Sequence, residues 1–223
     1  MPSERMLVLA NSRKTGGRCL AGVTLDGFRW VRPVSAHGQG ELSDEECTVD
    51  GRMPQLLEVV TFEHDGPEGD PAQPENVVLT DAEWTSEGMA SSALVREVIQ
   101  EVTLTRPPLL VNNGAAVPEH VAAEGLDASL ALIAPARLRI GHGPEAHPSA
   151  PGARALFAWA GAERNFPITD FVVGPRVRQR PQGLYAPEDL GLPAESKLRL
   201  TVSLGVAHES WCYKLVAAVV PLP

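Results

Sequence analysis

A run of cations and glycines near the start of the chain is the segment whose residue types point most directly to chemistry. Residues 11–19 read Asn-Ser-Arg-Lys-Thr-Gly-Gly-Arg-Cys and lie between two apolar segments. Guanidinium groups bind phosphate oxygens with paired hydrogen bonds, a lysine adds a point charge, and glycine allows the backbone to approach closely. The pattern predicts an anion site on a loop between two strands. A solvated hairpin tip with ordinary surface cations is the simpler alternative.

We assign candidate site residues by the role that each would have toward a bound phosphate. Arginine and lysine would neutralise it, Asn11, Ser12 and the glycine amides would orient it, and Trp30 would stack on a base. Cations from a later strand and from the end of the chain would extend the same face. The candidate ligand-binding residues are Asn11, Ser12, Arg13, Lys14, Gly16, Gly17, Arg18, Trp30, Arg32 and Lys214.

A secondary set of candidates lies in the second half of the chain. Trp211 and Tyr213 occur in the basic C-terminal segment and offer rings on which bases can stack. Thr169 and Asp170 follow a strand, where an acidic side chain suits a metal ion or a hydroxyl group. The other two tryptophans, at positions 84 and 159, lie among apolar residues, so we expect them in the core.

The charge distribution favours a small anionic ligand over long duplex DNA. The net charge is −9, but residues 1–34 hold six basic against two acidic side chains, and residues 171–223 hold six against four. The middle of the chain therefore carries a net charge of −15. If the two ends meet, they form one positive face on an acidic body, whereas duplex binding usually draws on roughly six to ten phosphate contacts.

The composition is that of a globular protein without a membrane segment. The chain has 223 residues, of which 43% are hydrophobic, enough for one large core or two small ones. No apolar run reaches the roughly 20 residues of a transmembrane helix, and the N-terminus lacks a leader pattern. Three scattered cysteines form no disulfide framework. We therefore expect a cytoplasmic protein.

Alternating and continuous apolar patterns predict about ten strands and one certain helix, at residues 91–102. In residues 28–34 the alternation places Trp30 at the edge of the core and turns Arg29 and Arg32 toward solvent. Crossover helices do not separate the strands regularly, so small β-barrels are favoured over a βαβ sheet. The expected strands cover residues 6–10, 19–24, 28–34, 55–64, 74–79, 129–140, 154–160, 166–170, 198–205 and 212–221, with loops at 161–165 and 206–211.

Several of these segments together resemble the prokaryotic dual OB-containing domain family. The resemblance covers essentially the whole chain. It is carried by Asn-Ser-Arg-Lys at 11–14, Gly-Arg-Cys-Leu-Ala-Gly at 17–22, Trp-Val-Arg-Pro-Val-Ser at 30–35, Gln-Pro-Glu-Asn at 73–76, Leu-Thr-Val-Ser-Leu-Gly at 200–205, and Trp-Cys-Tyr-Lys-Leu-Val-Ala-Ala-Val at 211–219.

The resemblance implies a mainly β fold with two OB-like small barrels and one or two inserted helices. We expect the first barrel, with the helix, in residues 1–125 and the second in residues 126–223, and sharing of the terminal strands between the barrels is an open alternative. The family's implied role is a nucleic-acid-sensing or nucleotide-sensing part of prokaryotic conflict systems. The acidic middle of this chain departs from a general nucleic-acid binder and argues against broad, sequence-independent binding.

No catalytic residue, metal ligand set or cofactor is assigned. Cys19 and Cys212 lie in apolar strands, and a zinc site that also used Cys47 would need three remote segments without paired cysteine spacing. A Walker loop, a G-x-S-x-G elbow and an H-E-x-x-H helix are missing from the sequence. A phosphate-ester hydrolase or nucleotide-modifying enzyme that uses the same basic pocket is nevertheless the first alternative.

The sequence therefore predicts a non-enzymatic module that binds a nucleotide or a short single-stranded nucleic acid. We also expect a protein partner encoded in the same operon and a sensor role in a prokaryotic defence system. We do not expect the protein to bind a membrane. The second alternative is a protein-interaction module that docks an acidic partner through the basic face.

Overall fold

The chain divides into two compact units in the computed structural model, which describes residues 2–14, 16–148 and 152–223. Unit 1 comprises Met1–Val102 and Ala123–Ser129, and unit 2 comprises Thr103–Ala122 and Leu130–Pro223. The expected boundary at residue 125 falls within the short segment that returns to unit 1. The fold is mainly β, with 46% of the residues in strands and 13% in helices, and it fits two OB-like domains.

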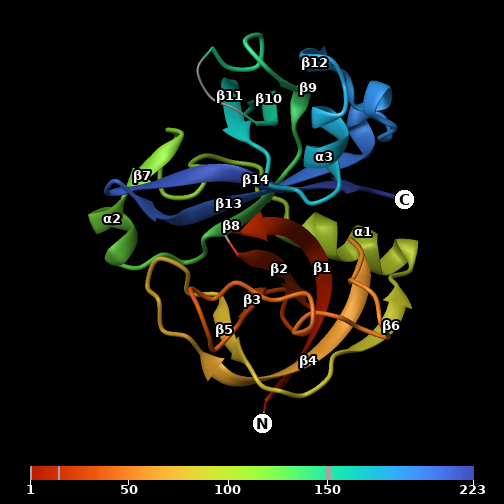
Figure 1. The fold of residues 1–223 in the computed structure, drawn as a ribbon, viewed down its shortest axis with the longest axis vertical. Coiled ribbons are helices and arrows are strands. Elements are labelled where there is room, and N and C mark those ends of the chain that lie inside the picture. Colours follow the sequence, from red (N-terminus) through yellow and green to blue (C-terminus); the bar gives the residue numbers. More distant parts are fainter. Residues whose placement is uncertain (1, 15, 149–151) are drawn as a thin grey trace. The chain divides into compact units, whose positions relative to one another are not determined.

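Unit 1 is built on a closed barrel of five strands (Figure 1). The strands follow the order β1-β2-β3-β5-β4, and β4 pairs back to β1 to close the ring. All neighbours are antiparallel except β3 and β5, which is the crossover that a Greek-key barrel of the OB type requires. The bounds are β1 Ser3–Lys14, β2 Gly17–Thr24, β3 Trp30–Val34, β4 Glu58–Pro67 and β5 Asn76–Leu79, with β6 Thr85–Met89 added to β4.

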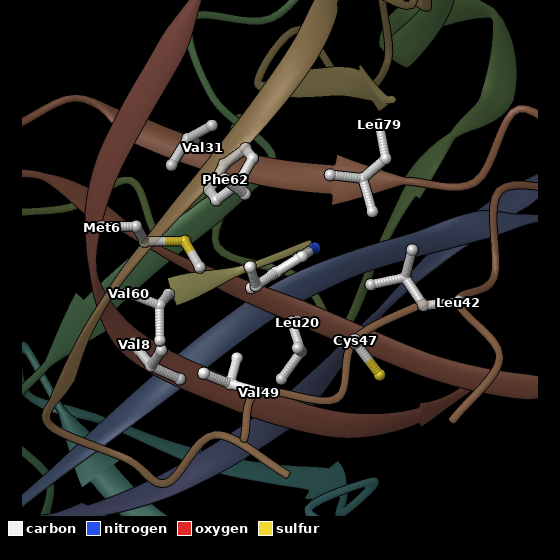
Figure 2. Packing of buried hydrophobic residues seen from close by; sticks show 11 residues of the cluster. Met6, Val8, Leu20, Val31, Leu42, Cys47, Val49, Val60, Phe62 and Leu79 are labelled. Carbon is white, nitrogen blue, oxygen red and sulfur yellow. The ribbon is translucent and has the colours of Figure 1, made fainter. Parts of the chain in front are cut away.

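The barrel interior is filled by apolar side chains that recur at alternate positions of the strands. Figure 2 shows Met6, Val8 and Val60 pointing into a common interior with Leu20 and with residues of the loop that joins β3 to β4. The indole of Trp84 closes this cluster and stacks on the ring of Phe62, with 4.9 Å between the centroids. The expectation that Trp84 and Trp159 belong to the core is confirmed, because both are buried.

The helix expected at residues 91–102 is confirmed as α1, Ser92–Val102. Its first turn is capped by Ser91, whose hydroxyl accepts a hydrogen bond from the Leu94 amide at 3.2 Å. Val95, Val98 and Ile99 form one buried stripe, as their spacing predicts.

Unit 2 contains two four-stranded antiparallel sheets, with the orders β7-β14-β13-β8 and β11-β10-β9-β12. Ala134 and Pro135 divide the single strand expected at residues 129–140 into β8 and β9. The strand bounds are β7 Ala116–Pro118, β8 Leu130–Ile133, β9 Ala136–His142, β10 Arg154–Trp159, β11 Ala162–Pro167, β12 Gly183–Tyr185, β13 Leu198–His208 and β14 Trp211–Pro221. The remaining helices are α2 Glu119–Ala123, α3 Val173–Arg178 and the 3₁₀ turns η1 Pro187–Leu190 and η2 Glu195–Lys197.

Two hairpins of unit 2 have tighter turns than the sequence predicts. The loops expected at residues 161–165 and 206–211 are wrong, because Trp159 pairs directly with Ala162 and His208 pairs directly with Trp211. Each turn consists of two residues with positive φ, Ala160-Gly161 and Glu209-Ser210. This is the geometry of a type I′ turn, whose twist matches that of the flanking strands.

The barrel of unit 1 also contains a buried carboxylate at the start of β4. Glu58 is almost fully buried and accepts two hydrogen bonds from the Arg52 guanidinium, at 2.7 and 2.8 Å. Hydrogen bonds from Arg52, and then from Ser86 and the Gln55 amide, outweigh burial and lower the pKa of Glu58 to about 2. Glu58 is therefore an ionised carboxylate at neutral pH, and it joins β4 to β6 by accepting a hydrogen bond from the Ser86 hydroxyl.

The helix stripe yields a stability prediction. Val98→Asp places a charge in a fully buried position, so we expect the free energy of unfolding to fall by about 3 kcal/mol or more. Gln100→Asp puts the same residue on the exposed side of α1 and serves as the control. Urea unfolding measures both, and equal stability of the two variants would show that α1 is not packed.

Glu58 yields a prediction about acid stability. A lowered folded-state pKa contributes stability above the unfolded value of 4.5, and this contribution is lost as the pH falls toward 2. Glu58→Gln should therefore lower the free energy of unfolding by about 2 kcal/mol at pH 7 and by almost nothing near pH 2. The figure at pH 7 is smaller than the full pKa shift implies, because solvent screens the half-exposed Arg52. Unfolding at several pH values tests this. Glu87→Gln, which breaks an exposed pair with Arg5, should show little pH dependence by comparison.

Candidate functional site

The cationic segment near the N-terminus forms the β1–β2 hairpin of unit 1. The strands extend further than expected, because Lys14 pairs with Gly17 and the connection is only two residues long. Of these two, Thr15 lies outside the described residues, and Gly16 has a positive φ of 89°. Asn11, Ser12, Arg13 and Lys14 are therefore strand residues, and the prediction that they form a loop is wrong.

The strand register places two arginines directly across from each other. Arg13 pairs with Arg18, so the two side chains leave the same face of the hairpin. Arg13 is exposed, whereas the Arg18 side chain is only 12% exposed. Like charges that face each other across two strands are destabilising, so this arrangement favours a negative charge close by.

That negative charge comes from the loop between β3 and β4. Leu42 pairs with Arg18 through two backbone hydrogen bonds of 2.8 and 2.9 Å, which places residues 39–44 along the edge of the hairpin. Asp44 Oδ1 lies 2.5 Å from Arg18 Nε. The Lys14 ammonium donates a hydrogen bond to the carbonyl oxygen of Gln39.

A second carboxylate of this loop lies against the hairpin turn. A Cβ at Gly16 would lie 3.3 Å from Glu41 Oε1, so the missing side chain leaves room for the Glu41 carboxylate. Hydrogen bonds from the backbone amides of Glu41 and Gln39, together with the nearby Lys14 charge, lower the pKa of Glu41. A side chain at Gly17 would collide with the Leu42 carbonyl, so this glycine permits the close approach of the loop.

The polar residues of β1 bond within the barrel. Ser12 is buried and donates a hydrogen bond to the carbonyl oxygen of Cys19 at 3.4 Å. Asn11 accepts a hydrogen bond from Arg18 Nη1 at 3.4 Å and donates one to the Pro54 carbonyl at 3.5 Å. These contacts hold the Arg18 guanidinium in place.

Arg32 does not face solvent, which corrects the prediction that it extends the cationic face. Its side chain is 3% exposed, and Nη2 lies 2.8 Å from Glu75 Oε1 and 2.9 Å from Ser129 Oγ. Ser129 donates to Glu75 through its hydroxyl and, at 3.0 Å, through its amide. Trp30, which lies two residues earlier on β3, is half-buried and pairs with Val23.

Lys214 is also buried, and so the prediction that it belongs to a cationic surface is wrong. Its ammonium donates to the Asn112 carbonyl at 2.6 Å, the Asn112 side-chain oxygen at 2.9 Å and the Gly114 carbonyl at 2.8 Å. Burial lowers the pKa of Lys214 to about 8, and the charge of Arg164 acts in the same direction. Within unit 2, Lys214 holds the loop before β7 against β14.

Thr169 and Asp170 have structural partners in unit 2. Thr169 donates its amide to the Val216 carbonyl at 3.0 Å. Asp170 is buried, and its carboxylate accepts hydrogen bonds from the amides of Val172, Val173 and Val219 at 2.7 to 2.8 Å. Burial raises the pKa of Asp170, while these amides lower it. Asp170 thus connects the backbone at the start of α3 to β14.

The two aromatic candidates of β14 are exposed side by side. Trp211 and Tyr213 are 45% and 46% exposed, and because they are two residues apart they leave the same face of the strand. Val206, in the paired strand β13, is also exposed. Exposed rings on one face of a sheet are the arrangement on which nucleic-acid bases can stack.

Unit 1 contains an acidic pocket that no sequence pattern predicted. It has a volume of about 530 Å³, and Leu79 and Trp84 contribute its apolar surface. Adjacent acidic residues in a loop usually indicate a solvated segment, and the association of two such segments depends on the tertiary fold. A pocket of this charge disfavours a phosphate. Its ionisable lining residues are His37, Glu45, Glu46, Asp50, Asp81 and Glu83.

The described part of the chain shows neither a metal cluster nor a membrane-spanning helix. Among residues 2–14, 16–148 and 152–223, no three His, Cys, Asp or Glu side chains are arranged to hold a metal ion. No helix in these ranges is both long and apolar enough to cross a membrane.

The buried ion pair of β3 yields a prediction. Glu75→Gln leaves the Arg32 guanidinium buried without its counter-charge, so we expect a loss of about 3 to 5 kcal/mol in the free energy of unfolding. The double variant Arg32→Met with Glu75→Leu should recover part of this loss. Glu4→Gln, which breaks the more exposed pair with Arg29, should cost less than about 1 kcal/mol. Denaturant unfolding measures all three, and a Glu75→Gln loss no larger than that of the control would contradict the argument.

Comparison with known proteins identifies the family of this chain. No curated protein and no solved structure matches it. The sequence model of the dual OB-containing domain family matches residues 4–219, which is nearly the whole chain. This confirms the resemblance noted in the sequence, and it agrees with the barrel of unit 1. An OB fold suggests binding of nucleic acid or oligonucleotides. The chain belongs to the dual OB-containing domain family.

Proposed function

We propose that this chain is a non-enzymatic module that binds the phosphates of a nucleotide or short single-stranded nucleic acid at the β1–β2 hairpin of unit 1. The observation that carries the proposal is the position of the cations in the barrel. Arg13, Lys14 and Arg18 gather at the β1–β2 connection, one of the loops with which OB folds contact oligonucleotides. Asn11 and Gly16 complete the proposed site by orienting Arg18 and by leaving space above the turn.

Arg32 and Lys214 are left out of the proposed site, because both are buried and paired within their own units. Ser12 and Gly17 support the hairpin from inside. The proposed site thus has three cations, which suits one to three phosphates better than a long strand.

Trp211 and Tyr213 form a separate candidate surface for base stacking, within unit 2. Stacking on an aromatic side chain contributes roughly 1 to 3 kcal/mol per base and tolerates any sequence. Phosphate contacts alone would make affinity depend almost wholly on salt, whereas stacking adds a contribution that salt does not screen. Trp30 is half-buried at the start of β3 and is a weaker candidate for stacking.

The proposed binding would be the sensing step of the defence role that the family resemblance implies. A protein partner encoded beside this chain would then read the occupied state. The acidic pocket of unit 1 makes a phosphate in that cavity unfavourable, so we place the ligand at the hairpin and outside the pocket.

The hairpin cations yield a binding prediction. The double variant Arg13→Ala with Lys14→Ala should weaken binding of a labelled oligo(dT) of about 12 nucleotides by roughly 1 to 3 kcal/mol and flatten its salt dependence. Fluorescence anisotropy at several salt concentrations measures both effects. Arg5→Ala with Arg29→Ala removes the same charge from the same unit, away from the turn of the hairpin, and should change affinity little.

Three results would redirect the assignment. Equal binding by the hairpin variant and the parent would show that the hairpin is an ordinary solvated turn. Turnover of a nucleotide during the same incubation, detected by product analysis, would favour the hydrolase alternative. Capture of an acidic protein that competes with the oligonucleotide would favour the docking alternative.

A further inference from the structure

We propose that Glu41 and Asp44 are internal competitors of the phosphate ligand, so that residues 39–44 autoinhibit the β1–β2 hairpin. The inference rests on the proposed function, because a competitor has meaning only if the hairpin binds an anion. It goes further by assigning a regulatory role to a loop outside the cation cluster.

The register of the hairpin creates a place for an anion beside two arginines. Arg13 and Arg18 face each other across the two strands, so the pair favours any anion that lies between or beside them. In the structure, the carboxylate beside Arg18 is that of Asp44, whose Oδ1 lies 2.5 Å from Arg18 Nε. A carboxylate and a phosphate present similar oxygens to a guanidinium group, so they compete for the same donors.

The same loop also lies against the turn of the hairpin. Gly16 leaves space that the Glu41 carboxylate borders, and Glu41 also lies near the Lys14 charge. The Lys14 ammonium itself bonds to Gln39 in the same loop. One short loop thus contacts the hairpin at its turn, at Lys14 and at Arg18.

Leu42 holds residues 39–44 in place. Leu42 is fully buried in the barrel core and forms the backbone bridge with Arg18, so it anchors the loop without help from the carboxylates. The Asp44 side chain is 72% exposed, so its carboxylate can leave Arg18 for solvent without unpacking the core. Leu42 therefore keeps the loop on the barrel when the Asp44 carboxylate moves away from Arg18.

The competitor model predicts that removing the carboxylate charges tightens binding. Glu41→Gln with Asp44→Asn should bind oligo(dT) of about 12 nucleotides roughly tenfold more tightly than the parent at low salt. The logarithm of its affinity should also fall more steeply with the logarithm of salt concentration, by about 0.7 for each additional phosphate that the hairpin neutralises. Fluorescence anisotropy measures the affinity and its salt dependence, and a thermal melt checks that the variant is folded at the temperature of the measurement.

The loop offers a matched control. Glu45→Gln with Asp50→Asn removes the same two charges from the same connection, and these side chains line the acidic pocket. The general change in net charge is therefore equal in the two double variants. We expect less than a twofold change in affinity for the control.

The outcomes separate the inference from the function on which it rests. Equal tightening by both double variants would show a general charge effect and overturn the inference. Unchanged affinity of the Glu41 and Asp44 variant, in a protein whose binding needs Arg13 and Lys14, would overturn the inference and leave the proposed function in place. Failure of every protein to bind, the Glu41 and Asp44 variant included, would overturn both.

Discussion

The pairing of β1 on both of its edges is the constraint on which unit 1 depends. Met6 and Leu7 pair with β2 on one side and with β4 on the other, which closes the barrel and removes its open edges. The pairing with β4 covers only Ser3–Leu7, so the later part of β1 continues into the hairpin beyond the strand that closes the ring. Arg13 and Lys14 therefore lie on an extension of a strand that the closed ring anchors, and Arg18 lies on the partner strand β2. β3 pairs with β2 only at Gly22 and Val23, which leaves the beginning of β2 without a strand on that edge. Leu42 covers this edge by pairing with Arg18.

Local pairing of charges reduces the number of cations that the basic segments leave exposed. Arg32 is buried against Glu75, and Arg52 is paired with buried Glu58. Arg18 is paired with Asp44. Each carboxylate comes from a different segment of the acidic middle, so part of the negative excess neutralises Arg18 and Arg32 of the N-terminal segment and Arg52 of the middle. The net charge of a segment sets the average potential around it, but the tertiary fold decides which charges remain available to a ligand.

The sequence predicted the fold better than the site, for physical reasons. Apolar alternation and the helical stripe at Val95, Val98 and Ile99 depend on local periodicity, and both were found. β6 was missed because Thr-Ser-Glu-Gly-Met has no apolar alternation, and it forms only by pairing with the edge of β4. The tight turn between β13 and β14 was missed because Glu209-Ser210 lacks the glycine that usually marks positive φ. The burial of Arg32 depends on Ser129, far along the chain, which no local pattern reveals.

The route of the chain between its units limits how the protein can be divided. Residues 103–122 belong to unit 2 and residues 123–129 return to unit 1 before the chain leaves it for good. Ser129, the last residue of that return, completes the buried network of Arg32 and Glu75. During synthesis, the first barrel therefore lacks part of its interior until residue 129 has left the ribosome, after a portion of the second unit has already been made. A single cut before residue 129 separates the buried Arg32 from the Ser129 hydroxyl to which it donates, whereas a cut after residue 129 leaves residues 103–122 of unit 2 on the first fragment.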